Sequence, residues 1–195
     1  MGRRRIRAPL ASLVAVVALL AGCGRGSSEP PATVAPATGN LPSGIDVVVR
    51  KVIDGDPIEV SGGERVRLIG IDTPETHDPN RPAGCFGIEA SRFTASVLAP
   101  GTPVRLVGDA EQRARYGRLL AYVYRRADGL FVNAELLRRG YAQLLTIPPN
   151  VAHTDEFAAL ARDARAGSQG LWAACTLMPD GRVAPASSSP RAGSG

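Results

Sequence analysis

The sequence predicts a small α+β domain, flanked on both sides by segments that cannot form part of its core. Three observations lead to this fold class. Short runs of β-branched residues end at turn signals, apolar stripes at helical spacing follow them, and large apolar side chains concentrate in the middle of the 195-residue chain. This length is sufficient for one domain with a buried core. We expect the folded unit over residues 45–178.

Five strands are expected, because runs of β-branched or alternating residues end at turn residues. They cover residues 46–52, 58–60, 65–69, 103–107 and 119–124. Ser61-Gly62-Gly63-Glu64 separates the second strand from the third, and Ala127-Asp128-Gly129 follows the fifth. Arg65 and Arg67 lie on the same face of the third strand, so alternation alone does not decide which of them points toward a site.

Three helices are expected between and after these strands. The first has an apolar stripe over residues 90–98. In the second, Asn133 is the predicted N-cap and Gly140 lies just past the end. In the third, Thr154 is the predicted N-cap, and Gly167 ends the helix.

Residue types suited to phosphodiester chemistry gather in three motifs. In chain order these are Asp54-Gly55-Asp56, the run Arg67-Leu68-Ile69-Gly70-Ile71-Asp72-Thr73-Pro74-Glu75, and Tyr116-Gly117-Arg118. An extended backbone places carboxylates two residues apart on one face. Such oxygen ligands suit Ca²⁺ or Mg²⁺ rather than zinc, and the sequence offers no competing cluster of His and Cys. Each short motif standing alone is more often a plain turn, but their order and spacing favour a site.

The other polar residues of these motifs are suited to bind phosphate and to activate water. Arg67 and Arg118 each offer a planar fork of donors to phosphate oxygens, where negative charge develops during attack by water. Glu75 is suited to orient or deprotonate that water, although a solvated loop acid is the alternative reading. Tyr116 and Arg115 are expected to bind substrate at the rim.

In this order and spacing, the three motifs resemble the staphylococcal nuclease (thermonuclease) family, and the resemblance covers essentially residues 45–172. It implies that the five strands close into an OB-fold β-barrel with about three helices. Periodicity alone does not name this barrel.

The resemblance also implies roles for individual residues. Asp56, Asp72 and the backbone carbonyl of Thr73 correspond to direct ligands of Ca²⁺, and Asp54 supports them without touching the ion. Arg67, Glu75 and Arg118 correspond to the catalytic residues. The implied activity is endonucleolytic cleavage of DNA, and of RNA as well, leaving 3′-phosphate ends.

Three positions depart from the family pattern. Pro57 follows Asp56 where threonine is usual, and proline removes a backbone donor beside a metal ligand. Ala114 replaces an aspartate of the best-known members. Thr146 takes the place of a tyrosine that lines the nucleotide pocket, so base stacking is expected to be weaker.

The first 22 residues read as a secretory signal. Arg3, Arg4, Arg5 and Arg7 precede an apolar run over residues 8–21, which is too short to span a membrane comfortably. The run ends in Leu20-Ala21-Gly22-Cys23, which resembles a bacterial lipobox and implies cleavage before a lipidated Cys23. The alternative is an ordinary signal peptide. Residues 23–44 then form a flexible linker and residues 179–195 a disordered tail. We therefore expect an exported lipoprotein anchored to the outer side of the cell membrane.

Charge and cysteine usage fit this organisation. The formal net charge of +5 falls to +1 once the four arginines of residues 1–22 are removed, so net charge argues nothing about nucleic acid. With Cys23 assigned to lipid, Cys85 and Cys175 remain, and in an exported chain a leftover pair is most simply a disulfide. Two free buried thiols are the alternative.

The leading functional prediction is a monomeric, lipid-anchored, Ca²⁺-dependent nuclease with DNA and RNA as substrates and no protein partner. The alternative is a catalytically inactive OB-fold lipoprotein that binds nucleic acid. A structural envelope lipoprotein leaves the combination of carboxylates and arginines unexplained.

Overall fold

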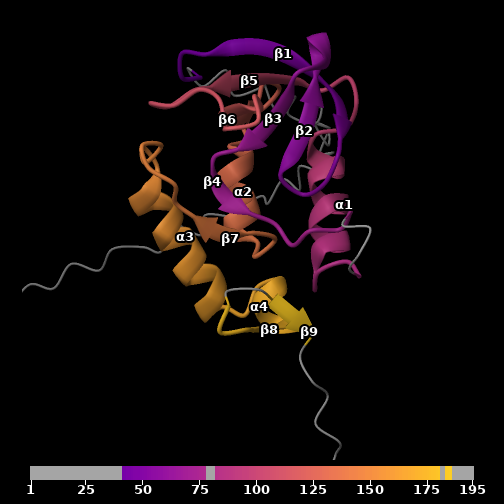
Figure 1. The fold of residues 1–195 in the computed structure, drawn as a ribbon, viewed down its shortest axis with the longest axis vertical. Helices are drawn as coiled ribbons and strands as arrows, with labels where there is room; N and C mark the ends of the chain where they lie inside the picture. Colours follow the sequence, from indigo (N-terminus) through magenta and orange to yellow (C-terminus); the bar gives the residue numbers. More distant parts are fainter. Residues whose placement is uncertain (1–40, 78–81, 181–182, 186–195) are drawn as a thin grey trace, which may run out of the picture. The chain divides into compact units, whose positions relative to one another are not determined.

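The folded unit contains a closed β-barrel in the computed structural model, which describes residues 41–77, 82–180 and 183–185 (Figure 1). The barrel strands are β1 (Ile45–Val52), β2 (Pro57–Val60), β3 (Arg65–Leu68), β5 (Pro103–Val107) and β6 (Leu119–Arg125). They are hydrogen-bonded in the order β1-β2-β3-β6-β5, and β1 closes onto β5. The predicted signal peptide, Cys23 and nearly all of the predicted linker lie outside the described residues.

All barrel neighbours are antiparallel except β3 and β6, which pair in parallel with Arg67 opposite Leu120. The inward-facing residues are almost completely buried. They include Val49, Ile58, Val66, Leu68, Val104, Leu106 and Val123. Alternation of apolar and polar residues therefore directs one face of each strand into a shared core.

Helices and short strands make up the rest of the described domain. The helices are α1 (Gly87–Val97), α2 (Val132–Arg138), α3 (Thr154–Ala166) and α4 (Leu171–Ala174), and a 3₁₀ turn covers Ser61–Gly63. The additional strands pair as β4 (Gly70–Asp72) with β7 (Gln143–Leu145), and as β8 (Cys175–Leu177) with β9 (Val183–Pro185). The predicted α+β class, with a five-stranded barrel and three longer helices, is confirmed. Within the described part of the chain, no helix has the length and apolar character needed to cross a membrane.

Two predicted N-caps are wrong. Asn133 lies inside α2, where its amide is fully buried and bonds to barrel backbone instead: it accepts from Val123 N at 2.9 Å and donates to Ile69 O at 2.8 Å. The caps are Phe131 for α2 and His153 for α3, neither with a capping side-chain bond. Asn133 satisfies backbone groups at the edge of the barrel, and this tertiary need outweighs the local capping preference.

The predicted disordered tail needs a correction at residues 183–185, which form β9. Pro179 and Asp180 form a turn after β8. Strand β9, which comes later in the chain, pairs with β8 in the antiparallel direction. Cys175, the first residue of β8, is joined to Cys85 by a disulfide, as the sequence predicts. The bridge ties the segment before α1 to the C-terminal part of the domain.

The disulfide gives a direct prediction. It closes a loop with a sequence separation of 90, so we expect it to stabilise the domain by about 2–4 kcal/mol. Chemical denaturation with and without reductant measures the difference. Intact-mass analysis after alkylation supplies the second readout: labelling of Cys85 and Cys175 without prior reduction contradicts the bridge.

Candidate active site

The loop between β1 and β2 brings two carboxylates into the interior. Asp54 and Asp56 are 3% and 5% exposed. The carbonyl of Pro57 accepts from Ile53 N at 3.0 Å and from Asp54 N at 3.3 Å, which closes the loop. Pro57 is the first residue of β2, a strand position that tolerates a missing donor, so it does not distort this loop.

Arg67 links Asp56 to Asp72. Its guanidinium lies 2.6 Å from Asp56 Oδ2 and donates to Asp72 Oδ1 at 2.9 Å. The contact to Asp56 is a close charge pair without an aligned N–H, since Asp56 Oδ2 is buried and accepts no hydrogen bond among the described residues. Burial raises the pKa of Asp56 to about 6, against the opposing effect of the Arg67 charge.

Helix α1 holds the carboxylate loop from behind. The buried Thr94 hydroxyl donates to Gly55 O at 2.7 Å. Gly55 itself permits close approach to Thr73, because a Cβ at this position would lie 2.5 Å from the Thr73 hydroxyl oxygen. Thr73 in turn donates to Asp56 Oδ1 at 3.3 Å. The loop that carries Asp54 and Asp56 is therefore packed against both α1 and the segment after β4.

Asp54 and Glu75 meet beside Thr76. Asp54 accepts from Thr76 Oγ1 at 2.8 Å and from Thr76 N at 2.9 Å. Burial by itself would raise the pKa of Asp54, but hydrogen bonds outweigh it and hold the pKa below its usual value. One Glu75 oxygen accepts from Thr76 N at 3.0 Å and from His77 N at 2.9 Å. Glu75 is exposed, and its carboxylate is oriented by its own loop.

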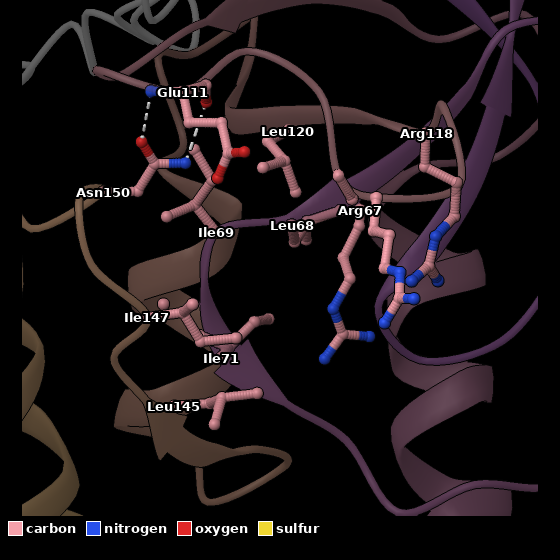
Figure 2. A pocket seen from close by; sticks show the side chains of 13 residues that line it. Arg67, Leu68, Ile69, Ile71, Glu111, Arg118, Leu120, Leu145, Ile147 and Asn150 are labelled. Carbon is pink, nitrogen blue, oxygen red and sulfur yellow. Dashed lines mark hydrogen bonds between the residues drawn. The ribbon is translucent and has the colours of Figure 1, made fainter.

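A cavity of about 320 Å³ adjoins the Arg67 side of this site. Figure 2 shows the guanidinium groups of Arg67 and Arg118 at one end, and Ile71, Leu145 and Ile147 at the other. Asn150 forms two bonds to the backbone of Glu111 at the rim, 2.7 Å to its N and 2.8 Å to its O. The cavity therefore has guanidinium groups at one end and aliphatic side chains at the other.

Arg118 stands immediately before β6, next to the strand that carries Arg67. Its guanidinium makes no ion pair or hydrogen bond with any other described residue, so its donors are available to a ligand.

Of the two residues predicted to bind substrate at the rim, Arg115 lines the cavity and Tyr116 does not. Arg115 lines the cavity with Ala114, and its guanidinium lies 5.9 Å from the ring centroid of Tyr116. Tyr116 is 81% exposed and does not line the cavity. Thr146 is exposed and contributes nothing to the lining.

The donor set fits a divalent cation of the kind the resemblance implies. The buried Oδ2 of Asp56 is an acceptor that lacks a hydrogen bond, and Asp72 lies beside it on the other side of Arg67. Asp56, Asp72 and the Thr73 carbonyl are the residues that would hold the ion. All three donors are oxygens, which favours a hard cation.

The raised pKa of Asp56 gives a pH prediction for the cation-free protein. The ionised carboxyl is less stable in the folded chain than in the unfolded chain, so stability is lost as pH rises from about 4 to about 6 and the loss persists above that range. Asp56→Asn is therefore expected to be nearly neutral at pH 4 and stabilising by up to about 3 kcal/mol at pH 7. Denaturation of both proteins in chelator checks this. A variant less stable than the parent at pH 7 contradicts it.

Some residues at the site escape prediction from sequence. Thr76 directly follows Pro74-Glu75, the end of the second motif, and its position beside Asp54 depends on long-range folding. Thr94 belongs to the apolar stripe of α1, where one hydroxyl among aliphatics is the only available signal. His77, which follows Thr76 and belongs to none of the three motifs, lies with its Nδ1 3.4 Å from Asp54 Oδ2.

These observations define a class of protein: a small OB-type barrel carrying buried carboxylates, with the guanidinium groups of Arg67 and Arg118 lining an adjoining cavity. The staphylococcal nuclease homologue family matches residues 65–174, which is more than half of the chain. The chain belongs to this family.

Curated relatives agree with the family assignment. The chain is 46% identical over 110 residues to a thermonuclease of Staphylococcus intermedius, covering 55% of this chain and 64% of the relative. It is 36% identical over 127 residues to a thermonuclease of Staphylococcus hyicus, covering 64% and 73%. Endonuclease YncB of Bacillus subtilis (strain 168) is 33% identical over 132 residues, covering 66% and 62%. The chain thus matches about two thirds of the length of these relatives.

Proposed function

We propose that this chain is a metal-dependent nuclease that hydrolyses phosphodiester bonds of DNA and RNA, uses Ca²⁺, and leaves 3′-phosphate ends. The observation that carries the proposal is the pairing of Asp56 and Asp72 through Arg67 at the edge of a cavity that Arg118 also lines. The names of the related thermonucleases and endonuclease support the same reaction class.

Different residues of the chain bind the phosphate and activate the water. Arg67 and Arg118 bind the non-bridging oxygens of the scissile phosphate, and their fixed donors stabilise charge that grows as water attacks phosphorus. Glu75 orients or deprotonates this water, with its carboxylate held by Thr76 N and His77 N. Asp56, Asp72 and the Thr73 carbonyl would hold a Ca²⁺ ion, which would add positive charge beside the phosphate.

The cavity also bears on substrate preference. Its far end is lined by Ile71, Leu145 and Ile147, all aliphatic. A base seated there gains apolar contact without aromatic stacking, so discrimination between bases is expected to be weak.

Product analysis tests the proposal against the inactive binding module. The full chain is incubated with single-stranded DNA and with RNA in Ca²⁺, and the product ends are determined. We expect multiple turnovers and 3′-phosphate, 5′-hydroxyl ends. Stable binding without cleavage would identify a binding module, and 3′-hydroxyl products would overturn the assigned bond.

We further propose that the mature protein begins at a lipidated Cys23 and is held at the outer side of the cell membrane. The support comes from sequence alone: the basic start, the short apolar run, the Leu20-Ala21-Gly22-Cys23 end and a polar linker. Roughly twenty flexible residues would let the nuclease reach polymer beyond the surface.

Cys23→Ser is expected to release the protein from the membrane without changing its activity in solution. Detergent-phase partitioning of both forms checks this, and the mass of the mature N-terminus locates the cleavage. A parent protein found in the aqueous phase and cut at another bond would mean simple secretion.

A further inference from the structure

A second set of ligands lies beside the proposed calcium site. Atoms of Asp54, Glu75 and His77 that can bind a metal all lie within 4.8 Å of one another. In the part of the chain that the structure describes, this is the one group of three or more His, Cys, Asp and Glu side chains with that spacing. The group includes His77, which belongs to none of the three sequence motifs.

The three side chains combine one fixed ligand with two adjustable ones. Asp54 is buried and is anchored by Gly55 N at 2.9 Å as well as by Thr76. Glu75 and His77 are exposed, and His77 directs its Nδ1 toward Asp54 Oδ2. Ligand atoms about 2.0–2.2 Å from one tetrahedral Zn²⁺ lie roughly 3.3–3.6 Å apart. The ligand atoms of the three side chains lie within 4.8 Å of one another, so the exposed side chains of Glu75 and His77 must turn inward to bind one ion.

Space and charge favour an ion at this point. Ile53 and Pro57 complete the lining of a solvent-accessible cavity of about 410 Å³ around the three ligands. Asp56 and Asp72 both pair with Arg67, whereas Asp54 and Glu75 have no lysine or arginine ion pair among the described residues. Within the described ranges, these two neighbouring carboxylates therefore have no lysine or arginine beside them to offset their charge.

We propose that Asp54, Glu75 and His77 form a site for a divalent transition-metal ion, with Zn²⁺ as the probe, and that its occupation inhibits the nuclease. An imidazole with two carboxylates suits zinc and related metals, whereas calcium takes oxygen ligands. A metal bound to Glu75 removes this carboxylate from its work on the attacking water. The inhibition rests on the proposed function, but the binding does not.

Zinc binding is measured on the full chain carrying Cys23→Ser, because the other two cysteines are joined in the disulfide. The chain has two histidines, so His153 serves as an internal control in a proton NMR titration. His153 packs against the rings of Tyr122 and Phe157, away from these ligands. We expect Zn²⁺ to shift the His77 ring signals and to leave those of His153 unmoved.

His77→Ala supplies the variant test. It keeps the backbone N–H that orients Glu75, and we expect zinc affinity to fall at least about tenfold by calorimetry. Calcium-supported cleavage should persist in this variant and become resistant to zinc. Unmoved His77 signals, or an unchanged affinity in the variant, overturn the site. Zinc binding at His77 in a chain that cleaves nothing would refute the proposed function and leave the site standing.

Discussion

Replacing Arg118 with alanine should lower the rate of phosphodiester cleavage by about 10²–10³-fold while leaving the fold intact. The guanidinium lines the cavity and has no partner among the described residues, so its removal leaves no buried charge behind. The free energy of unfolding should therefore change by no more than about 0.5 kcal/mol. Single-turnover kinetics and denaturation measure the two quantities.

Arg65→Ala is the matched control. Arg65 is exposed on β3, two residues before Arg67, and lies outside the cavity lining. Its loss removes one arginine charge from the face of β3 that also carries Arg67, without touching the cavity lining. Equal effects of both substitutions would assign Arg118 to general electrostatic attraction. A raised KM with an unchanged kcat in Arg118→Ala would make it a docking residue.

Asp72→Asn should remove nearly all metal-dependent cleavage. Asp72 is half exposed, so the substitution spares the core, but it removes one of two charged ligands from the proposed ion. Loss of an outer contact to a metal ligand already costs up to about 100-fold, and loss of a direct ligand should cost at least as much. Calcium titration of the cleavage rate measures the effect.

Asp128→Asn provides the control for that experiment. Asp128 is similarly exposed and also pairs with an arginine, Arg125, at 2.6 Å. It lies in the turn after β6, and its loss should leave the calcium dependence unchanged. Cleavage by Asp72→Asn at the parent rate and calcium concentration would mean that other residues hold the ion.

The barrel strands were predictable because their signals are local. β3 alternates Arg65, Val66, Arg67 and Leu68 between solvent and core, and each barrel strand begins and ends within a residue or two of its predicted bounds. The parallel pairing of β3 with β6 and the closure of β1 onto β5 join segments far apart in the sequence. No local pattern encodes those contacts.

Sequence patterns do not predict the role of a residue whose side chain bonds to a distant segment of the chain. Asn133 resembles an N-cap but bonds to barrel backbone, and Thr94 resembles an apolar helix position but holds Gly55. The short strands β4 and β7 carry only three residues each and depend on one another for pairing. At the site, the order and spacing of the motifs indicate Arg67 from sequence alone. Its pairing with both Asp56 and Asp72 is seen only in the folded structure.

We propose above that this carboxylate and arginine site cleaves the phosphodiester backbone with a bound metal. Cleavage of covalently closed circular DNA by the full chain, in Ca²⁺ and in excess chelator, tests it most directly, since a circle offers no ends and reports internal cuts. We predict that circles are opened and degraded in Ca²⁺ and remain closed in chelator. Circles opened equally in chelator, or left closed in Ca²⁺ by folded protein, would contradict the claim.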